Sequence, residues 1–197
     1  MRGKFIVFDG TDGSGKSTQA KMLAEWLRKK GEKVLFTHEP SRKTNLGKKI
    51  TRLSKSKNLT AKQWLKLFTE DRKYHIKNEI LPALKKGKIV ISDRYYYSTL
   101  AYQLPENKWN SYIRQFLKPD LAFICEVPAE ISLKRIKKAL KTDKERGGIS
   151  VFEKLKTLRK LRKKYLRMKR FSEVRIIDTT PSPEKIFEKI RKEVSKL

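Results

Sequence analysis

The chain has 197 residues and one cysteine, which is enough for one α/β domain with its own core and excludes an internal disulfide. Its 50 lysines and arginines against 21 acidic residues give a formal net charge of +29. No apolar run approaches the roughly 20 residues that a membrane span requires. We therefore expect a single domain over residues 1–197 in the reducing cytoplasm, with no membrane partner.

The predicted elements alternate along the chain. Five continuous apolar runs are typical of parallel strands that are covered on both faces, and they span residues 4–8, 33–37, 88–92, 121–126 and 174–178. Helical patterns fill the intervals, at residues 16–30, 44–54, 60–86, 109–117, 129–140, 152–168 and 183–196. This alternation predicts a doubly wound α/β fold with a largely parallel sheet. In such a sheet, ligands bind beyond the carboxyl ends of the strands.

The positive charge is dense between Lys134 and Arg170, which raises nucleic-acid binding as a hypothesis. Aromatic residues do not interleave with it as a base-stacking platform requires, and no zinc-finger or RNP-type motif occurs. A lysine-rich solvated surface, as in hyperthermophile proteins, is the plainer alternative, although the glutamates that usually accompany it are scarce. We expect no specific nucleic-acid binding, and an ATP-binding nucleic-acid-associated protein stays open as the less favoured alternative.

The first predicted strand leads into Gly10–Thr18, which reads GTDGSGKST and opens the first predicted helix. This is the Walker A pattern in its expected strand-to-helix context. The glycines let backbone amides surround phosphate oxygens, and the helix N-terminus adds partial positive charge. We expect Lys16 on the terminal phosphates of ATP and Ser17 on Mg²⁺. The predicted nucleotide-binding residues are Gly10, Thr11, Asp12, Gly13, Ser14, Gly15, Lys16, Ser17 and Thr18.

Two later clusters lie where an acceptor would bind. Phe68 and Arg72 are four residues apart, so a ring and a guanidinium share one helical face and suit a nucleobase. Asp93 directly follows a buried strand, where a carboxylate reaches metal-bound phosphates, and Arg94 can neutralise a phosphoryl group in transfer. The plainer readings are a core phenylalanine with a surface arginine, and an ion pair or helix cap.

Two further residues are interpreted more conservatively. His38, after the second strand, is expected to be structural or solvent-facing, because phosphoryl transfer onto a phosphate needs little proton removal. Cys125 lies in an apolar run and is expected to be a buried thiol. No Asn-Lys-x-Asp or Thr-Lys-x-Asp motif for guanine occurs, which disfavours a GTP switch.

Five stretches together resemble the thymidylate kinase family of P-loop nucleoside monophosphate kinases, nearly from end to end. They are FDGTDGSGKSTQ (8–19), THEP (37–40), LFTEDR (67–72), PALKKGKIVISDRYYYSTLAYQ (82–103) and KPDLAF (118–123). The resemblance implies a P-loop NTPase fold, a three-layer α/β/α sandwich with a small mobile lid at about 137–152. It also implies transfer of the γ-phosphoryl group of ATP to dTMP, with Mg²⁺, in a homodimer.

The resemblance assigns roles to individual residues. Asp12 matches the carboxylate that meets the sugar 3′-hydroxyl, Phe68 the ring that stacks on thymine, and Arg72 the residue at the base edge. Ser98 would lie beside the base, and Tyr102 would crowd the sugar so that a 2′-hydroxyl fits poorly. The implied substrate-binding residues are therefore Asp12, Arg42, Phe68, Arg72, Arg94, Ser98 and Tyr102. The implied catalytic residues are Lys16, Asp93, Arg94 and Arg146. The implied metal ligands are Ser17 and Asp93.

The chain departs from the family pattern at three places. His38–Ser41 reads HEPS where many relatives read Arg-Glu-Pro-Gly, and Arg42 would take over the missing arginine's contact with the acceptor phosphate. Gly13 replaces a P-loop arginine of some members, which moves the catalytic cation to the lid, where Arg146 is preferred over Lys141 and Lys144. Val151-Phe152-Glu153 replaces Arg-Tyr/Phe-Glu. A deoxynucleoside monophosphate kinase of broader base choice therefore stays open as an alternative.

Overall fold

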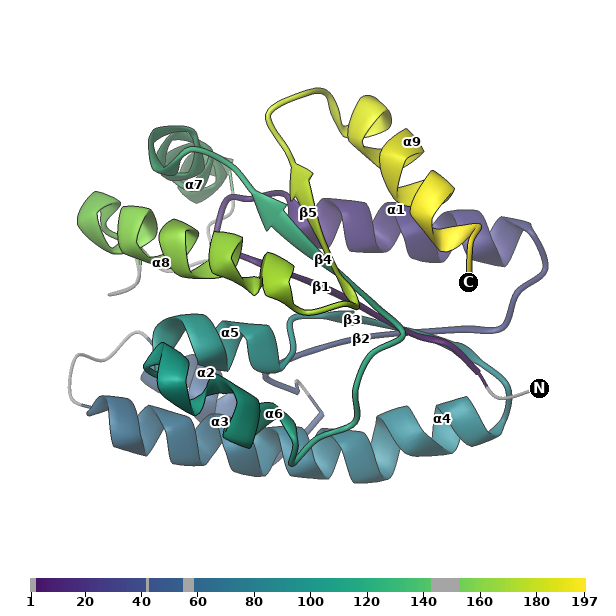
Figure 1. Cartoon of the computed structure of the whole chain (residues 1–197), viewed down its shortest axis with the longest axis horizontal. Coiled ribbons are helices and arrows are strands. Elements are labelled where there is room, and N and C mark those ends of the chain that lie inside the picture. The colour runs from purple at the N-terminus through teal and green to yellow at the C-terminus, as the bar shows by residue number, and fades with distance from the viewer. Residues whose placement is uncertain (1–2, 42, 55–58, 143–152) are drawn as a thin grey trace.

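The computed structural model describes residues 3–41, 43–54, 59–142 and 153–197. Its centre is a five-stranded sheet in the order β2-β3-β1-β4-β5, in which every neighbouring pair is parallel. The strands are β1 (Phe5–Gly10), β2 (Val34–His38), β3 (Ile89–Asp93), β4 (Leu121–Glu126) and β5 (Val174–Asp178). Figure 1 shows helices on both faces of this sheet, which confirms the predicted three-layer α/β architecture.

Helices and short helical turns connect the strands. They are α1 (Lys16–Lys29), α2 (Asn45–Leu53), α3 (Ala61–His75), η1 (Ile76–Ile80), α4 (Leu81–Lys85), α5 (Tyr96–Tyr102), η2 (Glu106–Lys108), α6 (Trp109–Ile113), α7 (Ala129–Thr142), α8 (Leu155–Arg167), η4 (Met168–Arg170) and α9 (Pro183–Val194). The hydroxyls of Thr44, Thr60 and Ser182 accept backbone N–H groups at the N-termini of α2, α3 and α9. These caps explain why the three helices begin where they do.

The expected continuous helix over residues 60–86 is interrupted. α3 passes into the π-helical turn η1 before α4 continues in nearly the same direction (Figure 1). Pro82 has no N–H to donate to the carbonyl of Asn78, so the α-helical ladder cannot run unbroken through this point. The wider turn accommodates the proline without ending the helical rod.

The strand β1 is apolar in a continuous run because each of its faces is covered by a different helical layer. Ile6 and Phe8 pack with residues of α1 and α9, among them Leu23 and Ile190. Phe5 and Val7 point to the opposite face, which is covered from α4, α5, α6 and α8. The alternation of neighbouring side chains between two cores is the two-residue period of a strand.

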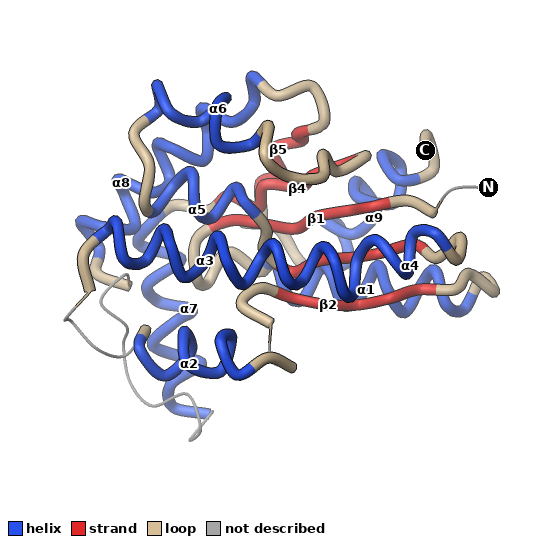
Figure 2. Tube along the Cα trace, turned by 90° about the horizontal axis from the view of Figure 1, so that it is seen from below, coloured by secondary structure: helices blue, strands red, loops and turns tan. Residues whose placement is uncertain are grey.

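The carboxyl ends of β1, β2 and β3 lie at the same edge of the sheet. Phe8 and His38 are both in register with Asp93; His38 and Asp93 end their strands, and β1 continues two residues beyond Phe8. The loop that follows β1 and the segment that follows β3 therefore meet at this edge. Figure 2 shows α2, α5 and α7 gathered beside it, so helices from three parts of the chain surround the carboxyl ends of the strands.

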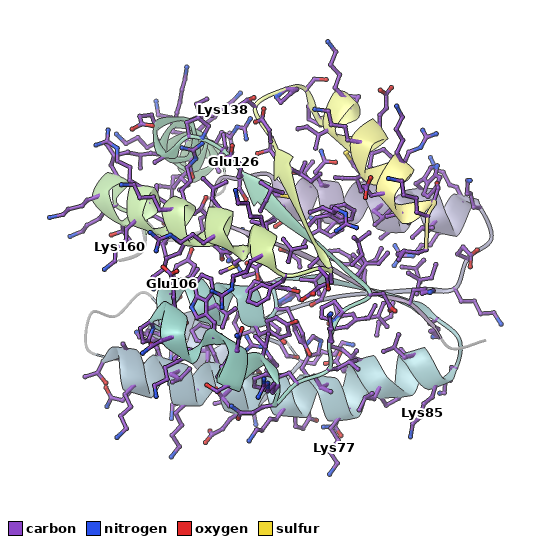
Figure 3. All side chains as sticks on the ribbon, in the orientation of Figure 1. Lys77, Lys85, Glu106, Glu126, Lys138 and Lys160 are labelled. Carbon is purple, nitrogen blue, oxygen red and sulfur yellow. The ribbon has the colours of Figure 1, made fainter. Side chains whose placement is uncertain are left out.

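Some of the basic residues form ion pairs between elements of the fold. Every charged residue from Lys154 to Arg170 is basic, yet three of them pair with acids of other elements: Arg159 with Glu130, Arg162 with Glu126 and Arg167 with Glu106. Others, such as Lys138 on α7 and Lys160 on α8, are exposed (Figure 3). Within the described ranges, no helix combines the length and the apolar character that crossing a bilayer demands.

Candidate functional site

The loop between β1 and α1 has a backbone that only glycine adopts easily. Gly10, Gly13 and Gly15 have φ angles of 146°, 76° and 79°. A Cβ atom on Gly13 would lie 2.5 Å from the backbone oxygen of Ser132, so this position also lacks room for a side chain. The P-loop arginine of some family members therefore cannot be placed at Gly13 unless the start of α7 moves.

The N-terminus of α1 is arranged to receive an anion. Its first residue is Lys16, and no side chain caps it and no acid occupies its first turn. The Lys16 ammonium lies over the loop, 3.4 Å from the backbone oxygen of Thr11 and 3.5 Å from Oδ1 of Asp12. The dipole of α1, the backbone amides of the loop and the Lys16 ammonium are thus directed at the same small volume, which suits the negative charge of phosphate groups.

Two buried oxygens beside this loop lack hydrogen-bond partners among the described residues. They are Oδ1 of Asp93, at the end of β3, and Oγ of Ser14 in the loop. A carboxylate oxygen without a donor, close to the helix that begins with Lys16 and Ser17, is the hard oxygen ligand that Mg²⁺ prefers. The residues present therefore fit the predicted metal site. Nearby, burial raises the pKa of the Cys125 thiol to about 12, which keeps this side chain neutral.

Asp9, the penultimate residue of β1, is the centre of a buried hydrogen-bond cluster. Its side chain is fully buried, and Oδ1 accepts from the backbone N–H of Gly10 (2.8 Å) and from the hydroxyls of Ser98 (2.7 Å) and Tyr165 (2.8 Å). Its Oδ2 accepts from the backbone N–H groups of Tyr95 (3.1 Å) and Ser98 (2.9 Å). Asp9 thereby fixes the start of α5 against the P-loop.

Arg94 follows β3 and is held on both sides of its guanidinium. Nη1 donates to the backbone oxygen of Gly10 (3.1 Å) and to Oγ of Ser98 (2.8 Å), and Nη2 forms an ion pair with Asp12. Its φ angle of 75° is left-handed, which is costly for a residue with a side chain. Strain of this kind persists where the surroundings fix a side chain for a function.

Asp12 and Arg94 stabilise each other in their ionised forms. Burial opposes ionisation of Asp12, but attraction to Arg94 and Lys16 outweighs it and holds the pKa of the Asp12 carboxyl well below its usual range. Burial likewise opposes the charge of Arg94, while Asp12 raises the pKa of Arg94. Asp12 is therefore a carboxylate and Arg94 a cation at any ordinary pH.

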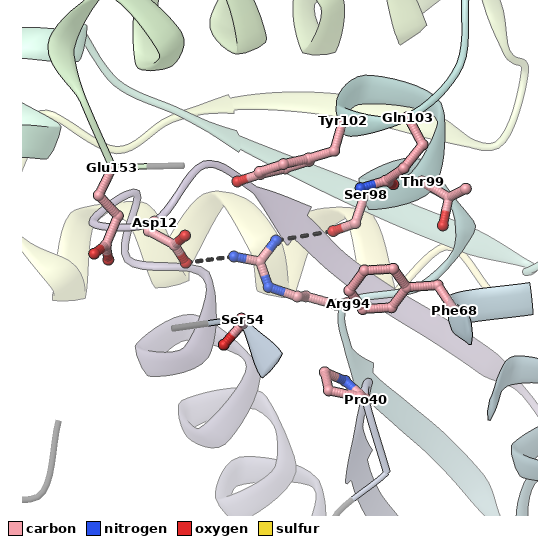
Figure 4. A pocket seen from close by; sticks show the side chains of 10 residues that line it. All are labelled: Asp12, Pro40, Ser54, Phe68, Arg94, Ser98, Thr99, Tyr102, Gln103 and Glu153. Atoms are coloured by element: carbon pink, nitrogen blue, oxygen red, sulfur yellow. Dashed lines mark hydrogen bonds and ion pairs between the residues drawn. The ribbon is translucent and has the colours of Figure 1, made fainter. Parts of the chain in front are cut away.

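A cavity of about 220 Å³ opens beside Arg94. Figure 4 shows the guanidinium between Asp12 and Ser98, with the rings of Phe68 and Tyr102 on either side of the open space. Of the residues predicted for the substrate, the cavity is lined by Asp12, Phe68, Arg94, Ser98 and Tyr102. Five lining residues were missed by sequence reasoning: Pro40, Ser54, Thr99, Gln103 and Glu153. Thr99 and Gln103 are four residues apart, and each directly follows a predicted residue, Ser98 or Tyr102, which could have indicated them.

Arg72 is absent from the lining of this cavity. It is 1% exposed, and its guanidinium donates to Oε2 of Glu39 (2.9 Å), the hydroxyl of Tyr112 (2.9 Å) and Oγ1 of Thr99 (3.1 Å). Burial disfavours its charge, but attraction to Glu39 raises its pKa. Arg72 thus supports the cavity from behind Thr99, whereas Phe68, four residues earlier, faces into it.

The remaining predicted residues lie at the start of α1, at the end of β2, on α7 or outside the described ranges. Ser17 is half-buried at the start of α1, while the side chain of Thr18 is exposed. His38 ends β2 at the site edge. Lys141 is exposed near the end of α7. Arg42, Lys144 and Arg146 lie outside the described residues, as does most of the expected lid.

Comparison with known proteins places these features in a family. The sequence model of the family described as Thymidylate kinase matches residues 8–190. A protein from Pyrococcus abyssi named "Probable thymidylate kinase" is 42% identical over 202 residues, covering 96% of this chain and 95% of its own. A protein from Caldicellulosiruptor saccharolyticus named "Thymidylate kinase" is 38% identical over 215 residues, covering 100% of this chain and 98% of its own.

Proposed function

The chain belongs to the thymidylate kinase family, and from this membership we propose that it transfers the γ-phosphoryl group of ATP to dTMP, giving ADP and dTDP. One observation carries the proposal beyond the family name. Asp12 lies in the phosphate-binding loop, pairs with Lys16 of that loop and forms an ion pair with Arg94 in the cavity. The proposed donor and acceptor sites would thus meet at Asp12, as transfer between two bound nucleotides requires.

On the donor side, the loop amides and Lys16 would hold the β- and γ-phosphates of ATP. The hydroxyl of Ser17 and the carboxylate of Asp93 would hold Mg²⁺, which when bound neutralises part of the phosphate charge. Lys16 is nine-tenths buried and lies against oxygens of its own loop, so its ammonium is already in place before a phosphate arrives.

On the acceptor side, the cavity offers a flat ring, a cation and a crowding ring in the order a nucleotide needs. Phe68 would stack on the base, Arg94 would bind the 5′-phosphate and Tyr102 would lie against the sugar. The carboxylate of Asp12 would accept the 3′-hydroxyl. Arg72, which lies behind the cavity lining, is proposed to act at the base edge through Thr99, to which its guanidinium donates.

In the chemical step, an oxygen of the acceptor phosphate attacks the γ-phosphorus and ADP leaves from the opposite side. The acceptor phosphate is already ionised, so no side chain has to remove a proton. Arg94 would contact the acceptor phosphate and stabilise the charge shared between the two phosphates in the transition state. We propose Arg42 as its companion and Arg146 as the cation of the lid.

The test is a coupled ATP-to-ADP assay with Mg²⁺ and a panel of dTMP, dUMP, dCMP, dAMP, dGMP and UMP. We expect dTMP to give the highest kcat/KM and UMP to be inert. Comparable turnover of several deoxynucleotides would favour the kinase of broader base choice. Turnover of none would overturn the proposal.

We further propose that the protein works as a homodimer in the cytoplasm. The resemblance to the family supports the dimer, and Tyr74 on α3 is a large side chain left 52% exposed. The buried free thiol of Cys125 suits a reducing compartment. Light scattering at micromolar concentration tests the dimer, and a monomeric mass would reject it.

A further inference from the structure

Tyr165 is a buried tyrosine that joins α8 to the phosphate-binding edge of the sheet. It is 1% exposed, and its hydroxyl donates to Oδ1 of Asp9 at 2.8 Å and lies 3.3 Å from Oγ of Ser98. Its ring meets that of Tyr102 nearly edge-on, with centroids 6.5 Å apart. The hydroxyl therefore contacts the cluster around Asp9, while the ring contacts a residue that lines the cavity.

Packing alone does not require this hydroxyl, since a phenylalanine would fill the same space. Burial raises the pKa of Tyr165 well above its usual range, so the group stays protonated and acts as a donor. Its acceptor is a carboxylate, and hydrogen bonds to charged groups are the stronger kind. The hydroxyl thus contributes a specific contact to Asp9 in addition to filling space.

This contact is one step away from Arg94. Oδ1 of Asp9 accepts from the hydroxyl of Ser98, and Oγ of Ser98 in turn accepts from Nη1 of Arg94 at 2.8 Å. The direct separation of that Nη1 from Oδ1 of Asp9 is 3.6 Å, longer than a hydrogen bond. If Oδ1 loses one of its donors, the nearest cation that can approach it is Arg94. The guanidinium would then move inward, away from Asp12 and the cavity.

Helix α8 is held by contacts with other elements on both sides of Tyr165. Arg162 binds Glu126 at the end of β4 (2.7 Å), and the Lys164 ammonium donates to the backbone oxygen of Leu104 just beyond α5 (2.8 Å). Arg167 forms an ion pair with Glu106. These contacts fix α8 against both β4 and the α5 segment, so the Tyr165 hydroxyl is held in a defined place.

We propose that Tyr165 is a positioning residue for phosphoryl transfer, which holds Asp9 and Ser98 so that the Arg94 guanidinium faces the acceptor phosphate. This inference rests on the proposed function, because it assigns Arg94 to the acceptor phosphate. Tyr165 itself touches neither nucleotide in this scheme. Its effect should therefore appear in the rate of transfer and leave ATP binding unchanged.

The chain offers a matched control in Tyr97. Its hydroxyl is also buried and also donates to a buried carboxylate, Oε1 of Glu173, at 2.9 Å. That carboxylate pairs with Lys118, and Glu173 is not among the described residues that line the cavity. Tyr97→Phe and Tyr165→Phe thus remove the same kind of hydrogen bond, but only the second removes a donor from the Asp9 cluster.

The experiment compares the kinetics and the nucleotide-free crystal structures of both variants with those of the unchanged protein. We expect Tyr165→Phe to lower kcat by about tenfold to a hundredfold, the scale on which a misplaced catalytic group acts, with the KM for ATP within about twofold. Tyr97→Phe should keep the full kcat. In the crystal, the Arg94 guanidinium should leave Asp12 only in Tyr165→Phe.

The outcomes separate this inference from the proposed function. If the unchanged protein phosphorylates dTMP and Tyr165→Phe matches Tyr97→Phe in kcat, the inference is wrong and the function stands. If the unchanged protein phosphorylates no acceptor, the proposed function fails, and the crystal structures then decide only whether Tyr165 positions Arg94. An Arg94 side chain that keeps its contacts to Ser98 and Asp12 in Tyr165→Phe would refute the positioning role in either case.

Discussion

The left-handed backbone of Arg94 allows function and stability to be separated at one position. Among the described residues, Arg94 is the one non-glycine residue with a positive φ, at 75°. A side chain in this conformation costs about 1–2 kcal/mol relative to glycine. Glycine, in turn, loses about 0.4–1 kcal/mol through the greater freedom of its unfolded chain. The backbone term is larger, so Arg94→Gly should be more stable than Arg94→Ala by about 1 kcal/mol.

Both variants lose the same guanidinium, so its contacts to Gly10, Ser98 and Asp12 cancel in the comparison. Urea denaturation gives the two free energies of unfolding, and the coupled assay with dTMP gives the two kcat values. We expect kcat to fall by about a hundredfold to a thousandfold in both variants, because each removes one charged group from the transition state.

The same pair of substitutions at Lys33 provides a control with the opposite sign. Lys33 is exposed and is not among the residues of positive φ. There, the glycine variant should be less stable than the alanine variant, by about 0.5–1 kcal/mol. If Arg94→Ala proves as stable as Arg94→Gly, backbone strain is not what Arg94 carries. If either variant keeps its turnover, Arg94 does not contact the transferred group.

Three more predictions follow from the loop and the cavity. Gly13→Ala should lower the free energy of unfolding by about 2 kcal/mol or more and abolish nucleotide binding. The reason is that its Cβ atom would lie 2.5 Å from the backbone oxygen of Ser132, in a left-handed backbone. Calorimetry with ADP tests this, and unchanged ADP binding would contradict it. Phe68→Ala should raise the KM for dTMP about tenfold through lost stacking and leave the KM for ATP unchanged, and equal rises in both would refute it. The pKa of Asp12 is lowered by folding from its ordinary 3.8, so its stabilising effect is present above pH 4 and is lost as the pH falls below that value. In acid titrations followed by circular dichroism, the stability advantage of the unchanged protein over Asp12→Asn should therefore shrink below pH 4, and a constant difference would contradict the prediction.

The strands and the P-loop were predictable because their signals are local. Each buried parallel strand is a continuous apolar run, and the glycines of the loop mark the positive φ angles that the fold requires. The break at Pro82 could also have been foreseen, since proline cannot continue a helical ladder. These features depend on neighbours within a few residues, which is the range that a sequence pattern reports.

The contacts of the site were harder to predict because their partners are far apart in the chain. Phe68 and Arg72 share a helical face, and the sequence therefore suggested that both meet the base. Four residues advance a helix by more than one full turn and about 6 Å along its axis, which is enough to place Phe68 in the cavity and Arg72 against Glu39. No local pattern marks Glu39 as the partner of Arg72, or Tyr165 as that of Asp9.

Asp9 at the end of β1 and Asp12 in the loop that follows are two neighbouring acids with different hydrogen-bond environments. Asp9 is fully buried, and five protein donors occupy its two oxygens, so it has no capacity left for a ligand. The Asp12 side chain is 29% exposed and lines the cavity, and the described residues that bond to its carboxylate all do so at Oδ1. A carboxylate that is saturated inside the protein can only fix geometry, whereas one that keeps an oxygen open can bind a hydroxyl. The sequence shows two aspartates three residues apart, and it is their hydrogen-bond partners, among them Ser98 of α5, Tyr165 of α8 and Arg94 after β3, that give them the different roles we propose.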